Sequence, residues 1–157
     1  MQLSFGMIFS IFLIVVLMGF GFYVIMQFLD FQTQATAGIF FDDLQNDVNN
    51  VWRSEESSIK VSYNVPSSVE YVCFVDFSSA VDNLEGIYSE LELISSGDKN
   101  VFVYPVGSGE GSDGKNVLHL DVPKTVQRDN PKCVKAIEGK VEVLLKKNYG
   151  ESLVYIE

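Results

Sequence analysis

The stretch FGMIFSIFLIVVLMGFGFYVIM, residues 5–26, decides the fold class of this chain. Its 22 positions contain no charged residue, no proline and no Asn or Asp. As an α-helix rising about 1.5 Å per residue it would extend about 33 Å, enough to cross the hydrocarbon core of a bilayer. All 21 acidic and 11 basic residues follow it, from position 30 onward. The sequence therefore predicts an uncharged membrane helix followed by an acidic, water-soluble remainder.

The formal net charge of −10 restricts the partners of this protein. Nucleic acid is not an expected partner, because phosphate binding needs a basic surface. An anionic membrane surface would also repel the acidic part of the chain. We therefore expect membrane lipid around the apolar stretch and no nucleic acid.

A removable secretory signal is the alternative to a permanent anchor. A signal has an apolar region of about 7–15 residues after a basic stretch, and neither feature is present here. The small-residue pattern ATAG, Ala35 to Gly38, still leaves cleavage open. The nearest basic residue, Arg53, is too far from the helix for the positive-inside rule. The terminal amine and the acidic domain favour a single-pass protein with its N-terminus inside and its soluble domain extracytoplasmic.

Helical periodicity continues beyond the apolar stretch. Polar residues fall largely between apolar residues that recur mostly at steps of three or four, namely Phe28, Phe31, Ala35, Ile39, Leu44, Val48 and Val51. One helix over residues 3–51 would be about 70 Å long. Gly38 would weaken it by about 1 kcal/mol relative to alanine. The predicted domains are residues 1–53, the transmembrane and amphipathic helix, and 54–157, a β-rich head.

The head is predicted from a change of periodicity after residue 54. Alternating patterns indicate strands at 59–65, 69–77, 100–106, 117–122, 133–137, 140–147 and 152–157, the last two joined as a hairpin. In 69–77 both faces carry apolar residues, so both are expected to be covered. A short helix is expected after a cap at Ser78 or Ser79, with Val81, Leu84, Ile87, Leu91 and Ile94 at helical spacing and Gly97 after its end. The predicted fold class is α+β: a long N-terminal helix, then a small, mostly antiparallel sheet head with one short helix.

Cys73 and Cys133 are the only cysteines, and their separation fits neither a zinc site nor a redox pair. In an oxidising compartment they would form a disulfide worth about 3–4 kcal/mol. Two buried free thiols are the alternative.

The start QLSF, Gln2 to Phe5, running directly into an uncharged helix, resembles the mature N-terminus of archaeal type IV pilin-like proteins. That family has a basic-Gly leader that is trimmed before a Gln-x-Ser start. Met1 stands where the cleavage glycine would be, and Gly6 stands where many pilins carry a glutamate. The resemblance covers about the first third of the chain in detail and the remainder only in architecture.

The resemblance implies that the apolar helix packs into the core of a surface filament and that the head faces outward. The assembly residues would be Phe5, Ile8, Phe12, Val15, Gly19, Phe22 and Met26. Gly19 and Gly21 fit a locally extended pilin helix, although glycine is also common in ordinary transmembrane helices. Self-association, with other pilin-like subunits as further partners, is therefore expected.

Residues that suggest chemistry are few. His119, the only histidine, is interpreted as a polar residue on the exposed side of a strand, and no nucleophile elbow accompanies it. The stretch GSGEGSDGKN, residues 107–116, lacks the endings of a P-loop and the ladder of an EF-hand, so a solvated surface loop is expected rather than a calcium site at Glu110 and Asp113. The acidic residues Asp42, Asp43 and Asp47 indicate a solvated helix face.

We therefore expect no enzyme activity, no cofactor and no metal. The first hypothesis is a pilin-like assembly subunit. The second is a monomeric, single-pass anchored binding domain that recognises a surface partner or ligand, and an anchored enzyme is a distant third. Trp52 is expected to pack the head onto the end of the long helix.

Overall fold

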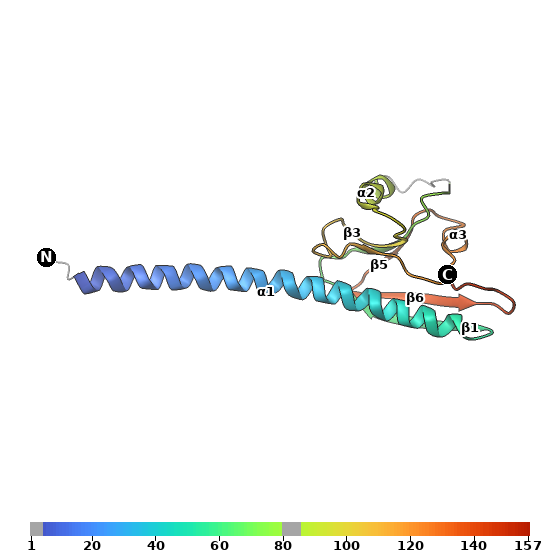
Figure 1. Cartoon of the computed structure of the whole chain (residues 1–157), viewed down its shortest axis with the longest axis horizontal. Coiled ribbons are helices and arrows are strands. Elements are labelled where there is room, and N and C mark those ends of the chain that lie inside the picture. The colour runs from blue at the N-terminus through green and yellow to red at the C-terminus, as the bar shows by residue number, and fades with distance from the viewer. Residues whose placement is uncertain (1–4, 80–85) are drawn as a thin grey trace. The chain divides into compact units, whose positions relative to one another are not determined.

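A computed structural model describes residues 5–79 and 86–157, with the side chain of Phe5 outside the described part. Its elements are α1 (Phe5–Trp52), β1 (Ser57–Asn64), β2 (Tyr71–Phe74), α2 (Ile87–Ile94), β3 (Val101–Tyr104), β4 (Gly114–Lys115), α3 (Val122–Thr125), β5 (Lys132–Lys135), β6 (Lys140–Lys147) and β7 (Tyr155–Ile156) (Figure 1). This confirms the α+β class with a long N-terminal helix and small antiparallel sheets.

The chain divides into two compact units, residues 1–32 and 33–157. Helix α1 contributes to both units, because its first 28 described residues belong to the first and its remaining turns to the second. The predicted domains, 1–53 and 54–157, follow secondary structure, whereas these units follow packing. The second unit therefore contains the last 20 residues of α1 together with every strand.

The second unit is built on two sheets with all strand pairs antiparallel. One has the order β1-β6-β7 and the other β4-β3-β2-β5. The main core joins both sheets to α1, whose Phe40, Leu44 and Val48 are at most 1% exposed. Strand β6 supplies Val141, Val143 and Leu145 to that core, as its alternation predicts.

The second sheet is covered on both faces, as predicted for 69–77. Val72 and Phe74 of β2 point into the main core. Cys73 points to the other face and joins a smaller cluster with Phe102 and with Leu91 of α2. Figure 1 shows α2 on this face of the sheet. Successive side chains of β2 point to opposite faces of the sheet, so the strand contributes alternately to two separate cores.

The buried face of α1 in the second unit differs from the predicted one. Ile39 is 60% exposed, and Ala35 is exposed as well. Leu44, Val48 and Val51 are buried as predicted, whereas Ala37, Phe40 and Phe41 are buried in place of Ala35 and Ile39. Stepping back from Leu44 by three or four residues reaches Phe40 and Phe41, whereas the step of five to Ile39 leaves the helical stripe.

Two predicted elements are wrong in part. Residues 117–122 form no strand: a turn at residues 118–119 precedes an isolated parallel bridge between Leu120 and Val154, and then α3 begins. Asp121 caps α3 through its side chain, and a proline occupies its first turn, which starts a helix where alternation suggested a strand.

Helix α2 begins after Gly86 and not at Ser78 or Ser79, where a turn is closed on Asp76. Val81 and Leu84 lie outside the described residues.

Candidate functional site: the apolar helix and its anchorage in the folded unit

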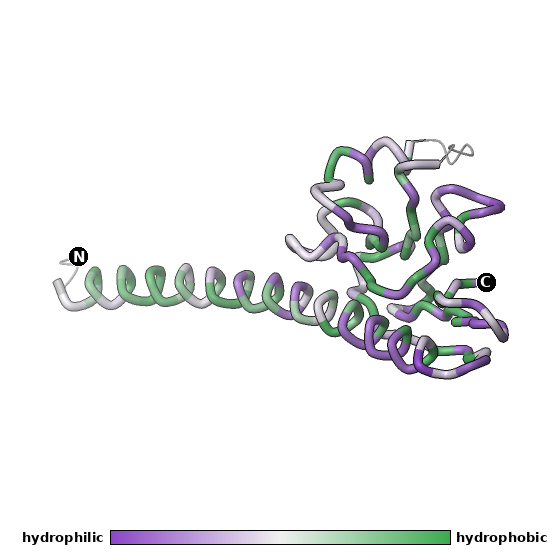
Figure 2. The backbone as a smooth tube through the Cα atoms, turned by 45° about the vertical axis from the view of Figure 1, so that its right-hand side comes forward, coloured by the Kyte–Doolittle hydropathy of each residue, from purple (hydrophilic) through white to green (hydrophobic). Residues whose placement is uncertain are grey.

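The first unit presents apolar side chains all around α1. Over residues 7–31 the large hydrophobic side chains are 43–69% exposed, with no side that is buried by the chain itself. Figure 2 shows the N-terminal turns of α1 mainly in the hydrophobic colour, with pale bands between them, before hydrophilic residues appear further along the helix. A helix that is apolar on every side is stable in lipid or among other apolar helices, and not in water.

Helix α1 is long and apolar enough to cross a membrane, which fits a single-pass membrane protein and also fits a signal sequence. In its apolar part the hydroxyl of Ser10 donates to the main-chain oxygen of Gly6 at 2.8 Å. A polar group in a hydrocarbon environment needs such an internal partner.

Six of the seven expected assembly residues lie on the surface of this segment. Ile8, Phe12, Val15, Phe22 and Met26 are 54–69% exposed. Gly19 also lies at the surface, and a Cβ atom built on Gly19 or Gly21 would meet nothing within 4 Å. Neither glycine is required by packing within the chain, so both leave a shallow gap on the helix. Phe5 and the QLSF start cannot be placed, since residues 1–4 and the Phe5 side chain lie outside the described part.

In the second unit a polar row along α1 holds the turn at residues 118–119. The Gln45 side chain pairs with the main chain of Leu118, accepting from its N–H at 2.7 Å and donating to its oxygen at 3.2 Å. The same amide donates to Oδ1 of Asn49 at 3.0 Å. Oδ1 of Asn49 also contacts Nδ1 of His119 at 3.0 Å, which places the hydrogen on that ring nitrogen.

One turn further, Trp52 completes this row. Its ring stacks on the His119 ring, and its Nε1 donates to the main-chain oxygen of Ser152 at 3.0 Å. Trp52 therefore joins the end of α1 to two separate loops, in agreement with the expected packing role. Gln45, Asn49 and Trp52 follow helical spacing of four and three, so one side of α1 carries the whole row.

The C-terminal end of α1 is capped by a lysine from the sheet. Lys147 of β6 is only 8% exposed, and its ammonium donates to the main-chain oxygens of Trp52 at 2.6 Å and of Ser54 at 2.8 Å. The last carbonyls of a helix have no intrahelical partner and carry partial negative charge, so a cation is stabilising there. Alternation in β6 turns Lys147 toward α1, because it follows Val143 and Leu145 at steps of two.

His119 does not lie on the exposed side of a strand, and that interpretation is wrong. The residue is half-buried in a turn with a φ of 65°, between Asn49 and Trp52. Its neighbour Leu118, which strand alternation would place on the opposite, inner face, is 57% exposed. The positive φ reverses the chain at this point and interrupts strand alternation.

The glycine-rich stretch 107–116 is more ordered than a solvated loop. Ser108 and Gly109 are buried, and the Gly109 N–H donates to Oδ1 of Asp113 at 2.8 Å. Gly114 and Lys115 pair with β3. A Cβ on Gly109 would come within 2.6 Å of the Ser112 oxygen, so this turn requires glycine. Across residues 5–79 and 86–157, no group of three or more His, Cys, Asp or Glu is placed to hold a metal ion.

The acidic residues of α1 are not merely solvated. Asp42 forms an ion pair with Lys115 of β4. Asp47 accepts from the Tyr63 hydroxyl at 2.9 Å. Burial raises the pKa of Tyr63, and the hydrogen bond to Asp47 and the charges of Asp47 and Asp43 raise it further. These carboxylates therefore hold the first sheet and β4 against α1.

Cys73 and Cys133 are joined by a disulfide, with Cα atoms 4.0 Å apart. They face one another in the antiparallel pair β2–β5. The free-thiol alternative is thereby excluded. The bond crosses the sheet directly beneath α2 and closes a chain segment of 60 residues.

Comparison with family models, with curated proteins and with solved structures finds no match to the chain.

Proposed function

We propose that this protein is a pilin-like, membrane-anchored subunit that assembles with copies of itself through the apolar part of α1. In this proposal the N-terminus is inside and residues 33–157 form an extracytoplasmic head at the cell surface. The subunit performs no chemistry, and its association contributes to a surface filament or a related assembly.

One observation carries the proposal: the exposed apolar segment and the central core helix of the folded unit are parts of the same helix α1. An anchor that only tethers a domain needs no such continuation and can be joined by a linker. Here Phe40, Leu44 and Val48 of α1 form the middle of the main core, and Lys147 caps the helix end. Copies that associate through the apolar segment would therefore be joined by the same helix whose later turns form the main core of each head.

Gly19 and Gly21 support close approach between copies. Between helices in lipid, association depends on van der Waals packing, and small residues allow backbones to come near. Both glycines lack any neighbour within the chain. The disulfide supports an oxidising compartment for the head, since such bonds persist outside the cytosol.

Gly19→Leu tests the proposal without removing the anchor. Leucine raises apolarity, and a Cβ atom at this position meets no other part of the chain within 4 Å, so insertion and folding should be unchanged. Full-length protein in mild detergent should form ordered oligomers or filaments, and Gly19→Leu should reduce them strongly. Ile39→Leu, an apolar change at an exposed position of the second unit, is the matched control and should leave assembly intact.

Val15→Lys tests the same association by placing a charge in the apolar segment. A lysine at this 63% exposed position should abolish assembly, whereas Ile39→Lys should not. Alkaline extraction of membranes shows whether the Val15→Lys protein is still inserted. If wild-type protein is monomeric at every concentration in lipid, the anchored binding domain is the better account and the assembly proposal fails.

A further inference from the structure

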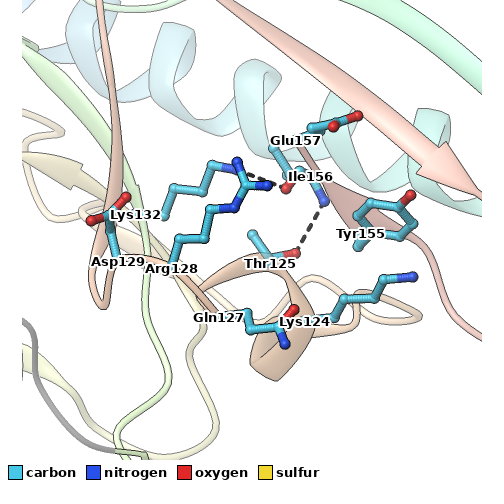
Figure 3. A pocket seen from close by; sticks show the side chains of 9 residues that line it. All are labelled: Lys124, Thr125, Gln127, Arg128, Asp129, Lys132, Tyr155, Ile156 and Glu157. Atoms are coloured by element: carbon cyan, nitrogen blue, oxygen red, sulfur yellow. Dashed lines mark hydrogen bonds between the residues drawn. The ribbon is translucent and has the colours of Figure 1, made fainter.

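A second candidate site lies in the folded unit, away from α1. A cavity of about 310 Å³ opens between α3, β5 and β7. Figure 3 shows the side chains of Lys124, Arg128 and Lys132 around it, together with Thr125 and Tyr155. The volume lies at the lower end of the range for small-molecule sites. Three basic residues line one cavity in a protein whose formal net charge is −10.

The cationic ends of two of these residues converge. Lys132 is half-buried and donates from Nζ to the main-chain oxygen of Ile156 at 2.9 Å, which holds its ammonium inside the cavity. Burial lowers the pKa of Lys132; the carboxylate of Glu157 opposes this effect, and the nearby guanidinium of Arg128 adds to it. The electrostatic repulsion between two nearby cations is reduced when an anion binds between them.

The cavity offers unused donors. Lys132 uses one of its three N–H groups on Ile156. The Arg128 guanidinium is exposed and makes no hydrogen bond or ion pair with any residue that the structure describes. Thr125 also lines the cavity, and its Oγ1 accepts from the Ile156 N–H at 3.1 Å, which fixes β7 beside α3.

The acidic residues at the cavity offset its positive charge only in part: the charges of Glu157 and Asp129 raise the pKa of Lys132, but burial still leaves that pKa lowered. Glu157 is engaged by Lys146 of β6. The carboxylate of Asp129 points to the opposite side from the Arg128 guanidinium (Figure 3). Lys124 is already paired with Glu151 and lies over the Tyr155 ring, so it closes one side of the cavity and leaves the ligand to Arg128 and Lys132.

From this arrangement we infer that the cavity between α3, β5 and β7 binds a small oxyanion, either a carboxylate or a phosphate, with Arg128 and Lys132 as its principal contacts. The guanidinium fork matches the two oxygens of either group. Lys132 supplies a point charge from the wall. The inference does not depend on assembly through α1.

The test is a calorimetric titration of the full-length protein in non-ionic detergent at constant ionic strength. Succinate and inorganic phosphate are the two probes, and chloride is the reference anion. Saturable binding of succinate alone would assign a carboxylate ligand, and saturable binding of phosphate alone would assign a phosphate ligand. Binding of both would assign the shared oxyanion chemistry.

Variants distinguish a built site from general charge. Arg128→Gln should weaken binding about tenfold or more, since a charged hydrogen-bond donor is lost. The affinity of Arg128→Lys should lie between those of wild type and Arg128→Gln, because lysine keeps the positive charge but lacks the two-pronged guanidinium. Lys135→Gln is the matched control, because Lys135 is an exposed residue at the end of β5 outside the cavity. Absence of saturable binding, or equal losses in Arg128→Gln and Lys135→Gln, would overturn the inference.

Discussion

The indole ring of Trp52 stacks on the imidazole ring of His119, with ring centroids 3.8 Å apart and planes only 8° from parallel. This contact joins the last turn of α1 to a turn that lies 67 positions later in the chain. Around it, Gln45 and Asn49 pair with the same turn. The end of α1 is therefore held by side chains that the helix itself supplies.

Trp52→Ala should destabilise the folded unit by about 2–3 kcal/mol, less than for a fully buried tryptophan because the side chain is 36% exposed. Thermal unfolding followed by circular dichroism measures the loss. A double-mutant cycle with His119→Ala should give a coupling of about 0.5–1.5 kcal/mol. Additive losses would show that the stack contributes nothing beyond buried area.

Lys147→Met should cost about 2–4 kcal/mol, because two charge-assisted hydrogen bonds to the end of α1 disappear. Denaturant unfolding at constant detergent gives the change. Lys60→Met is the control: Lys60 forms a surface pair with Glu142 in which both side chains are more than half exposed, so its loss should cost less than about 1 kcal/mol. Equal effects of the two changes would refute the capping role.

Removing the disulfide should lower the free energy of unfolding by about 3–4 kcal/mol, because the closed segment spans 60 residues. The double variant Cys73→Ala, Cys133→Ala tests this without a reductant. Its α1 should remain helical, since the bond lies in the second sheet and not in the main core. A variant as stable as wild type would contradict a structural role for the bond.

Acid should destabilise the folded unit through its surface carboxylates. Hydrogen bonds from Lys124 and Lys146 hold the pKa values of Glu151 and Glu157 below the ordinary value of 4.5. A depressed pKa gives stability that is fully present above the unfolded value and is lost as the pH falls through the folded one. The melting temperature should therefore change little between about pH 5 and neutral pH and fall below about pH 4.5. The double variant Glu151→Gln, Glu157→Gln should show a smaller fall in melting temperature at acid pH. If the fall is as large as in wild type, other titrating groups cause it.

Local patterns in the sequence predict the elements whose burial is periodic. The stripe through Leu44, Val48 and Val51 and the two-faced strand around Cys73 are found as the spacing indicates. The stripe was misplaced N-terminal to Leu44, because apolar residues at both Ile39 and Phe40 allow two paths along the helix. The start of α3 could have been read from Asp121 and Pro123, which form a cap and first turn.

Other features leave no local signal. Gln45 pairs with Leu118 across 73 positions, and the inward turn of Lys147 follows from the place of β6 beside α1. Only the tertiary arrangement of α3, β5 and β7 gathers Lys124, Arg128 and Lys132 around one cavity. Tertiary contacts decide such sites, and residue type alone does not.

Intermolecular distances between apolar helices test the assembly proposal most directly. Both cysteines are bonded, so Val15→Cys adds a single thiol for a spin label. Full-length protein in lipid vesicles at high dilution is then measured by pulsed dipolar spectroscopy. Assembly predicts a defined distance between copies, consistent with helix axes about 8–10 Å apart, that Gly19→Leu removes. A signal no different from randomly dispersed monomers would contradict association through α1.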